Sequence, residues 1–163
     1  MSAATFQLGK LQNLLCGATV QVLEASIISA DERVARKLAV TAGKRTIYIR
    51  RLLWNQGEPV FYHREYLVYD PTRPIVESEL EVTALQQLFS GSSESLLKHG
   101  VISIEATLLD AEECRLLKAV QPMAAFCFEH VFYDFENRPL SWGWFIGRAD
   151  RLRFTTCVGL LME

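Results

Sequence analysis

Alternating apolar and polar residues, rich in Ile, Val, Tyr, Phe and Trp, predict that much of this chain is β-strand. Two such runs flank Asn55-Gln56-Gly57-Glu58, where Gly can supply the positive φ of a tight hairpin turn, and a polar turn at residues 135–138 joins two later runs. A hairpin makes its two strands antiparallel. The predicted strands are residues 19–28, 45–54, 59–68, 101–109, 124–133, 140–146 and 152–160.

Helices are predicted where apolar residues recur at helical spacing behind a polar capping residue. Ser29 and Glu32 have the spacing of a capping box, in which each side chain binds a free backbone amide, so we expect a helix from residue 29 to about residue 40. Asp110 and Glu113 predict a second helix that starts at residue 110. Shorter helices are predicted at residues 6–15, 82–89 and 92–98.

The first half of the chain is repeated in the second half. Residues 24–32, Glu-Ala-Ser-Ile-Ile-Ser-Ala-Asp-Glu, are similar to residues 105–113, and Pro59 and Pro139 each follow a polar turn. Two copies are too few for a solenoid. We therefore expect one α+β domain with a mainly antiparallel sheet, helices packed on one face and an internal two-fold pseudo-repeat. A helical segment at residues 1–18 would precede this domain, which covers residues 19–163.

Composition excludes several classes of protein. Half of the 163 residues are hydrophobic, enough for a core without disulfides or metal, and the formal charge of −2 is unsuited to binding nucleic acid directly. No apolar run approaches the roughly 20 residues of a membrane span, and no secretory signal is apparent, so we expect a cytoplasmic protein without membrane contact. Cysteine spacing and the absence of nucleotide-binding, metalloprotease or hydrolase motifs predict no metal, cofactor or catalytic residue.

Four segments resemble one known family. Residues 49–59 are similar to its Arg-containing strand and Asp-Gly-Glu-Pro turn, and Arg64-Glu65-Tyr66-Leu67 stands at its second hairpin strand. Residues 133–140 and 147–154 resemble its Tyr-Asp-x-x-Gly-x-Pro-Ile and Arg-Gly-Asp-x-Tyr-x-Phe signatures. The family is the UTRA domain, the effector-binding half of HutC/GntR-type transcription regulators, which shares its fold with chorismate lyase. The resemblance covers about residues 19–157.

The resemblance implies a small, usually anionic metabolite bound beside the sheet, and a homodimer. It also implies that DNA is contacted only through a winged-helix domain, for which too few residues precede the first predicted strand. The strand Arg that faces the ligand in this family corresponds to Arg51. His63 and Ser141 stand where many sugar-phosphate-sensing members have Glu, a difference that argues against a sugar phosphate. Trp142, Trp144 and Phe145 replace more polar residues, which indicates a flatter, more aromatic ligand or a pocket partly filled by side chains.

The residues themselves support several of these assignments and leave alternatives open. Arg50 and Arg51 are adjacent on a strand and so point to opposite faces; we expect Arg51 on the covered side, as an anion site, although a surface ion pair with Glu would also explain it. Arg148 is included in the predicted ligand site, but pairing with Asp150 to hold a loop is its simpler interpretation. Glu129 is a candidate for the ligand site. If its side chain faces solvent, it is simply a polar residue of an alternating strand.

Two histidines complete the candidates. His63 and His130 lie beside aromatic residues on predicted strands, where an imidazole can contact a ligand or simply bind a backbone carbonyl. The leading hypothesis is an effector-binding and dimerisation domain of a bacterial transcription regulator, without chemistry of its own. One alternative is a chorismate lyase-like enzyme that releases pyruvate, with Arg51 and Arg148 on the carboxylates and Glu129 as the acid. Another is a stand-alone metabolite-binding protein.

Overall fold

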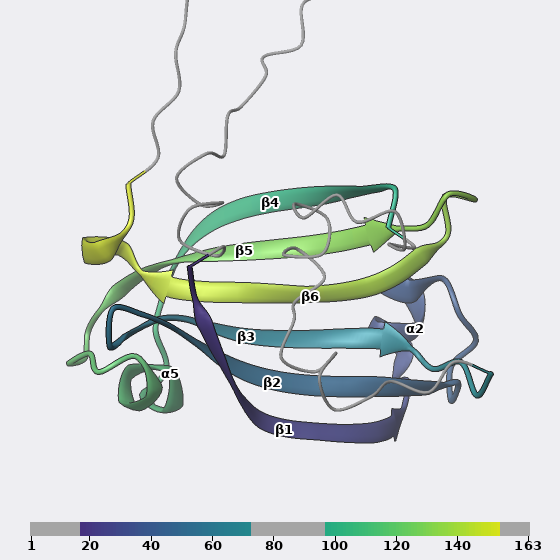
Figure 1. The fold of residues 1–163 in the computed structure, drawn as a ribbon, viewed down its shortest axis with the longest axis horizontal. Coiled ribbons are helices and arrows are strands. Elements are labelled where there is room, and N and C mark those ends of the chain that lie inside the picture. The colour runs from purple at the N-terminus through teal and green to yellow at the C-terminus, as the bar shows by residue number, and fades with distance from the viewer. Residues whose placement is uncertain (1–16, 73–96, 154–163) are drawn as a thin grey trace, which may run out of the picture.

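The computed structural model describes residues 17–72 and 97–153, which form one antiparallel sheet and two short helices (Figure 1). The elements are β1 (Thr19–Ser29), α2 (Glu32–Leu38), β2 (Arg45–Asn55), β3 (Glu58–Val68), β4 (His99–Leu108), α5 (Ala111–Leu116), β5 (Ala124–Tyr133), β6 (Pro139–Arg148) and the 3-10 turn η1 (Ala149–Arg151).

The strands predicted from alternation are confirmed for both hairpins. The β2–β3 turn contains only Gln56 and Gly57, both with positive φ, the geometry of the hairpin turns that follow the twist of the strands. The predicted strand 152–160 does not begin at Leu152 or Arg153, where the chain leaves η1, and its remainder lies outside the described residues. The predicted helix 92–98 does not include Leu97 or Lys98, which are not helical, and its other residues lie outside the described ones. The predicted helices 6–15 and 82–89 also lie outside them.

The two helices differ in how well their starts were predicted. Asp110 and Glu113 form the predicted capping box at α5, with amide–carboxylate distances of 2.8 and 2.9 Å. The prediction for α2 is wrong by two residues: Asp31 is its N-cap and accepts the Val34 amide at 2.8 Å. Ser29 is the last residue of β1 and pairs with Arg45, so its backbone is held in the sheet and cannot cap the helix.

The internal repeat is present in three dimensions. The strand order β1-β2-β3-β6-β5-β4 places the first three strands beside the last three in mirrored order, joined through β3 and β6. The helix caps Asp31 and Asp110 occupy corresponding places, whereas the sequence similarity pairs Asp31 with Glu112. The copies therefore differ by two residues in the link between strand and helix.

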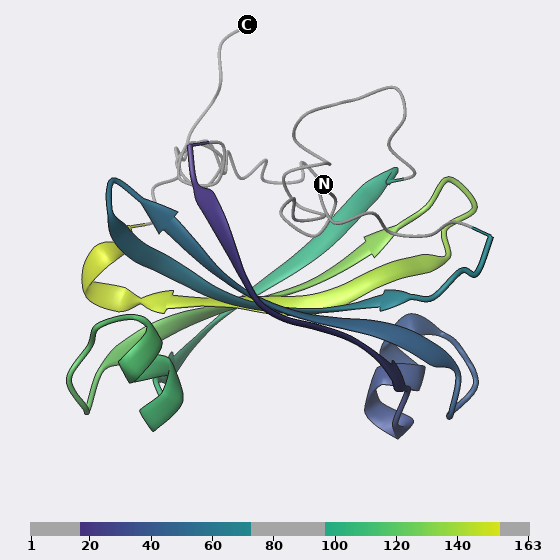
Figure 2. The ribbon, with the colours of Figure 1, turned by 60° about the horizontal axis from the view of Figure 1, so that its bottom comes forward.

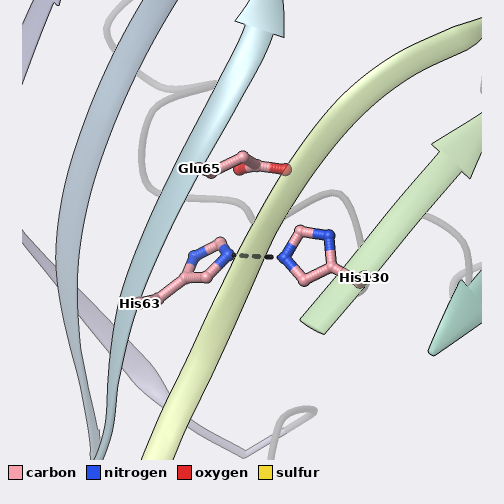
Figure 3. Close-up of side chains that lie close together, drawn as sticks. All are labelled: His63, Glu65 and His130. Carbon is pink, nitrogen blue, oxygen red and sulfur yellow. Dashed lines mark hydrogen bonds between the residues drawn. The ribbon is translucent and has the colours of Figure 1, made fainter. Parts of the chain in front are cut away.

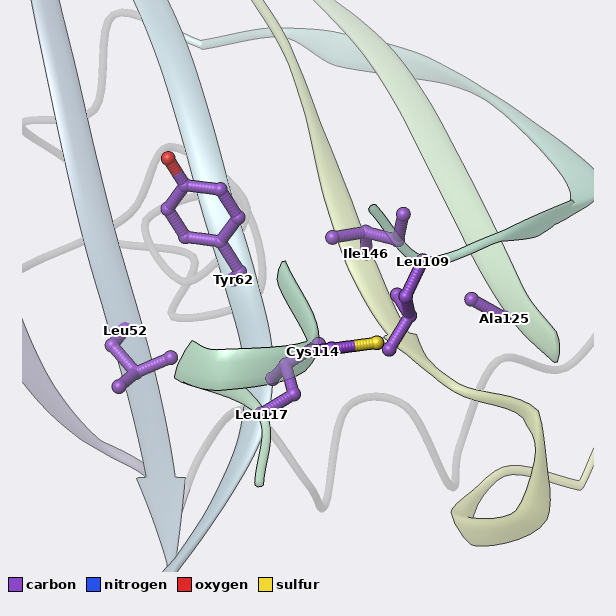
Figure 4. Close-up of a cluster of buried hydrophobic side chains, with 7 residues drawn as sticks. All are labelled: Leu52, Tyr62, Leu109, Cys114, Leu117, Ala125 and Ile146. Carbon is purple, nitrogen blue, oxygen red and sulfur yellow. The ribbon is translucent and has the colours of Figure 1, made fainter. Parts of the chain in front are cut away.

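The twisted sheet has two chemically different faces, because neighbouring residues of a strand point to opposite sides. Both α2 and α5 lie on one face, as Figure 2 shows. The α5 end of that face has the core cluster drawn in Figure 4, in which Leu52 and Tyr62 meet Cys114 and Leu117, and the α2 end packs Leu38 against Trp142. No described helix is long and apolar enough to cross a membrane.

Candidate functional site

A buried polar cluster lies on the opposite face, in the middle of the sheet. We call it the histidine cluster. Its members come from four adjacent strands, and each exposes at most 1% of its surface: Arg51 on β2, His63 and Glu65 on β3, Ser141 on β6 and His130 on β5. His63, Glu65 and His130 are drawn in Figure 3.

Strand register brings these residues together. Arg51 pairs directly with His63, while Glu65 and His130 each pair with Gly143 on the intervening strand β6. A Cβ on Gly143 would lie 2.1 Å from the Arg64 carbonyl oxygen and 2.9 Å from the Glu65 Cα, so the strands could not keep this spacing with any larger residue. Gly143 therefore allows the close approach of β6 to β3 at Glu65.

Arg51 and Glu65 form a buried ion pair. Arg51 Nη1 lies 2.5 Å from Glu65 Oε2, and the Ser141 hydroxyl donates to Glu65 Oε1 at 2.5 Å. Both carboxylate oxygens thus have a donor, which a buried charge requires. Because the positive and negative charges compensate each other, this pair adds no net charge to the cluster.

The hydrogen-bond chain determines which nitrogen of each histidine carries the proton. Arg51 Nη1 lies 3.4 Å from His63 Nδ1, and a guanidinium can only donate, so Nδ1 accepts and the proton of neutral His63 is on Nε2. His63 Nε2 lies 3.0 Å from His130 Nε2, which must then accept. The proton of neutral His130 is consequently on Nδ1. Among the described residues, that buried Nδ1–H has no hydrogen-bond partner.

Burial keeps both imidazoles neutral. Desolvation lowers the pKa of His63 well below 6.5, and the nearby Arg51 and His130 lower it further. Desolvation also lowers the pKa of His130 to about 4, although the Glu65 carboxylate acts in the opposite direction. At neutral pH the cluster therefore consists of one compensated ion pair, two neutral imidazoles and a hydroxyl.

Aromatic rings surround the imidazoles. Phe145 stacks on His63 with ring centroids 3.8 Å apart and planes 3° from parallel, and Phe132 lies against His130 at 4.7 Å. These phenyl rings belong to an apolar cluster with Leu53, Phe61 and Phe128 on the same face. The polar cluster is thus set in an apolar wall of aromatic rings.

His63, Glu65 and His130 also present ligand atoms for a metal ion, all within 4.8 Å of one another. Their present hydrogen bonds disfavour that use. The two carboxylate oxygens of Glu65 are taken by Arg51 and Ser141, and the Nε2 of His63 carries a proton rather than a free lone pair. A divalent cation would have to displace the Arg51 guanidinium from Glu65.

Arg51 is buried, as expected for the covered side of the sheet, although the two described helices pack on the other face. Both described helices lie on the face of Arg50, which donates to Glu112 of α5 at 2.5 Å and to the Tyr62 hydroxyl at 2.6 Å. Arg50 is the arginine that joins the sheet to a helix. Arg51 instead belongs to the histidine cluster on the other face.

Two of the predicted site residues lie elsewhere. Glu129 is on the helix face, where it pairs with Lys37 at 2.6 Å and accepts from the Trp142 indole at 2.7 Å. The hydrogen bond from Lys37 is the main cause that lowers the pKa of Glu129. Arg148 pairs with Asp150 and donates to the Lys118 carbonyl at 2.9 Å, so it ties η1 to the end of α5. Neither contacts the histidine cluster.

Glu65 was not among the residues predicted for the ligand site, and neither was His130, for which ligand contact was weighed against a purely structural role. The signal for Glu65 was present: it is two residues after His63, and residues two apart on a strand share a face.

Comparison with known proteins identifies the family. The UTRA domain model matches residues 17–153, and the chain belongs to this family. The effector domain of PhnF from Mycobacterium smegmatis is 26% identical, with a TM-score of 0.74 over 93% of this chain and 91% of that one. The ligand-binding domain of a putative GntR-family regulator from Bordetella bronchiseptica is 19% identical, with a TM-score of 0.73 over 87% and 91%.

A longer relative has the same fold. The possible transcriptional regulator YydK from Bacillus subtilis has a TM-score of 0.75 at 13% identity, and the match covers 87% of this chain but 63% of that one. This chain thus spans less than two thirds of YydK. The predicted chorismate lyase-like fold and the UTRA resemblance are confirmed, and the chain is an effector-binding regulatory domain.

Proposed function

We propose that a small-molecule effector binds over the histidine cluster and accepts a hydrogen bond from His130 Nδ1. The observation that carries this proposal is the buried Nδ1–H, which lacks a partner among residues 17–72 and 97–153. A buried donor without an acceptor costs free energy that an effector oxygen would recover on binding. The apolar rings of Phe132 and Phe145 would then pack against the body of the effector.

The effector we propose is a metabolite with a carboxylate or another anionic oxygen. A charged acceptor makes a stronger hydrogen bond than a neutral one in an apolar environment. Arg51 is already paired with Glu65, so the proposed donor to the effector oxygen is the Nδ1–H of neutral His130. Protonation of His130 would place a second N–H against His63 Nε2–H, so the neutral form is the one that binds.

At the level of the whole protein, we propose a cytoplasmic, homodimeric transcription regulator. Its DNA contacts would come from a winged-helix domain outside the described residues, and the effector would act by shifting the relation between two such domains. Catalysis is not part of the proposal. The lyase arrangement requires Arg51, Arg148 and Glu129 in one pocket, whereas Glu129 and Arg148 bind groups on the helix face and Arg51 lies on the other.

A thermal-shift screen tests the proposal. Chorismate, 4-hydroxybenzoate, urocanate, dicarboxylates and sugar phosphates would be tested separately against the pure protein. At 100 times its Kd, an effector stabilises the fold by about 2.7 kcal/mol. We expect at least one carboxylate to raise the melting temperature and to be recovered unchanged. Consumption of chorismate with release of pyruvate would instead establish the enzyme.

A pair of His130 variants assigns the response to the proposed donor. Asn retains an N–H close to the position of Nδ1, while Gln retains an acceptor close to Nε2, so we expect His130→Asn to keep most of the response and His130→Gln to lose it. Glu129→Gln is the matched control, since Glu129 is the neighbouring residue on the opposite face. Equal responses from the wild type and His130→Gln would contradict the proposed site.

A further inference from the structure

A chain of hydrogen bonds joins Arg51 to the proposed effector donor. Arg51 Nη1 lies 3.4 Å from His63 Nδ1, and His63 Nε2 lies 3.0 Å from His130 Nε2 (Figure 3). The far end of the chain is His130 Nδ1, the buried nitrogen that is proposed to meet the effector. Two imidazole rings therefore separate the guanidinium from the effector atom.

Two neutral imidazoles in a row can transmit a hydrogen-bond direction, because each ring carries one proton and one free lone pair. If His63 accepts at Nδ1, it donates from Nε2, and His130 then accepts at Nε2 and donates from Nδ1. In the reverse direction, His130 would accept at Nδ1 and His63 would donate from Nδ1. The reverse direction sets an imidazole N–H against Arg51, whose guanidinium has no acceptor.

Burial makes this exclusion of the reverse direction effective. Arg51, His63 and His130 each expose at most 1% of their surface, and opposed N–H groups in a buried place are costly. The guanidinium is also held in position by its ion pair with Glu65, whose other carboxylate oxygen accepts from Ser141. The donor end of the chain is therefore fixed by the fold.

We propose that Arg51 sets the specificity of the effector site through His63, so that the atom bound at His130 Nδ1 must be a hydrogen-bond acceptor. This inference rests on the effector site proposed above and adds the rule by which that site discriminates. A carboxylate oxygen is admitted, whereas an ammonium or amidinium group, which can only donate, is rejected. Arg51 acts as a positioning residue, since it directs the proton of His130 from two rings away.

Two variants interrupt the chain at different points. Arg51→Met with Glu65→Gln, the double variant, removes a positive and a negative charge together and leaves the net charge of the cluster unchanged. His63→Phe keeps the ion pair and retains a flat ring against Phe145, which stacks on His63 at 3.8 Å, but it has no nitrogen to pass on the direction. Because the second variant leaves the buried charges intact, the test does not depend on the folding of the first.

The first readout is the tautomer of His130 in the effector-free protein, observed by proton–nitrogen NMR. The wild type should hold His130 wholly as Nδ1–H, and both variants should populate the Nε2–H tautomer, because no donor then faces Nε2 obligatorily. Ser141→Ala is the matched control: it removes a donor to Glu65 but leaves Arg51 in place, and it should keep the wild-type pattern. Nδ1–H alone in either folded variant, or a changed pattern in the control, would overturn the inference.

Acetate and acetamidinium test the specificity itself, since they are similar in size and shape but acetate only accepts and acetamidinium only donates. Titrations followed at the His130 resonances should give the wild type a Kd for acetate that is lower by roughly tenfold or more. This ratio should fall in the double variant, and an unchanged ratio there would contradict the inference. A wild type that does not respond to acetate would count against the effector site instead, and the tautomers would still decide the role of Arg51.

Discussion

Arg51→Met is expected to lower the free energy of unfolding by about 3–5 kcal/mol, the range for removal of one partner from a buried ion pair. The change removes the guanidinium that donates to Glu65 Oε2, so the buried carboxylate keeps the Ser141 hydroxyl but loses its positive partner, and His63 Nδ1 loses its donor. Urea denaturation followed by circular dichroism measures the effect as a shift in the transition midpoint.

The double variant Arg51→Met with Glu65→Gln should recover much of this loss, because the uncompensated charge is gone. Arg50→Met is the control on the adjacent residue. Its partners Glu24 and Glu112 are 42% and 36% exposed, so solvent screens these ion pairs and the loss should be smaller. If Arg50→Met and Arg51→Met cost the same, the buried pair would not be the dominant electrostatic feature of the sheet.

Acidification is expected to destabilise the protein before most carboxylates titrate. In the unfolded chain His130 takes up a proton near pH 6.5, whereas in the folded protein its pKa is about 4. The unfolded state therefore binds more protons in this interval, and stability falls as pH falls. The contribution of neutral His130 to the free energy of unfolding is fully present well above pH 6.5. By pH 4 a loss on the order of 3 kcal/mol has accumulated from His130 alone. His63, whose pKa is also lowered, adds to the loss.

Carboxylates with a shifted pKa also contribute to this profile. Glu129 and Asp134 have a lowered pKa and lose stabilisation at more acidic pH, while burial raises the pKa of Glu113 and acts in the opposite direction. The contribution of the histidines is isolated by comparing the wild type with a variant that lacks both imidazoles over the interval from about pH 6.5 to 5. Urea midpoints across this interval should decline in the wild type and stay nearly level in His63→Gln with His130→Gln. Parallel declines in the two proteins would show that the buried histidines are not responsible.

The elements of this fold could be predicted because they depend on local patterns. Strand alternation and the turn at Gly57 identified the first hairpin, and Asp110 with Glu113 identified the start of α5. The start of α2 was misplaced because Ser29 and Glu32 fit the capping-box spacing, although Ser29 is committed to the β1–β2 ladder. Local capping preference was overridden by pairing with a distant strand.

The site depends on how residues of different strands pair, which the sequence of one strand does not reveal. Opposite faces for Arg50 and Arg51 followed from alternation, but which of them faced the helices depended on the packing of α5 against Arg50. The approach of His130 to His63 requires β6 to lie between β3 and β5 in a particular register. Glu129 was a reasonable candidate by residue type, and one position along the strand separates it from the cluster.

The proton on His130 Nδ1 is the central feature of this account, and long-range proton–nitrogen NMR of the imidazoles observes it directly. We expect His63 to be protonated on Nε2 and His130 on Nδ1 in the effector-free protein, and a carboxylate that stabilises the fold to shift the His130 Nδ1 resonance most. A His130 found in the other tautomer, or left unchanged by such a carboxylate, would contradict the proposed effector site.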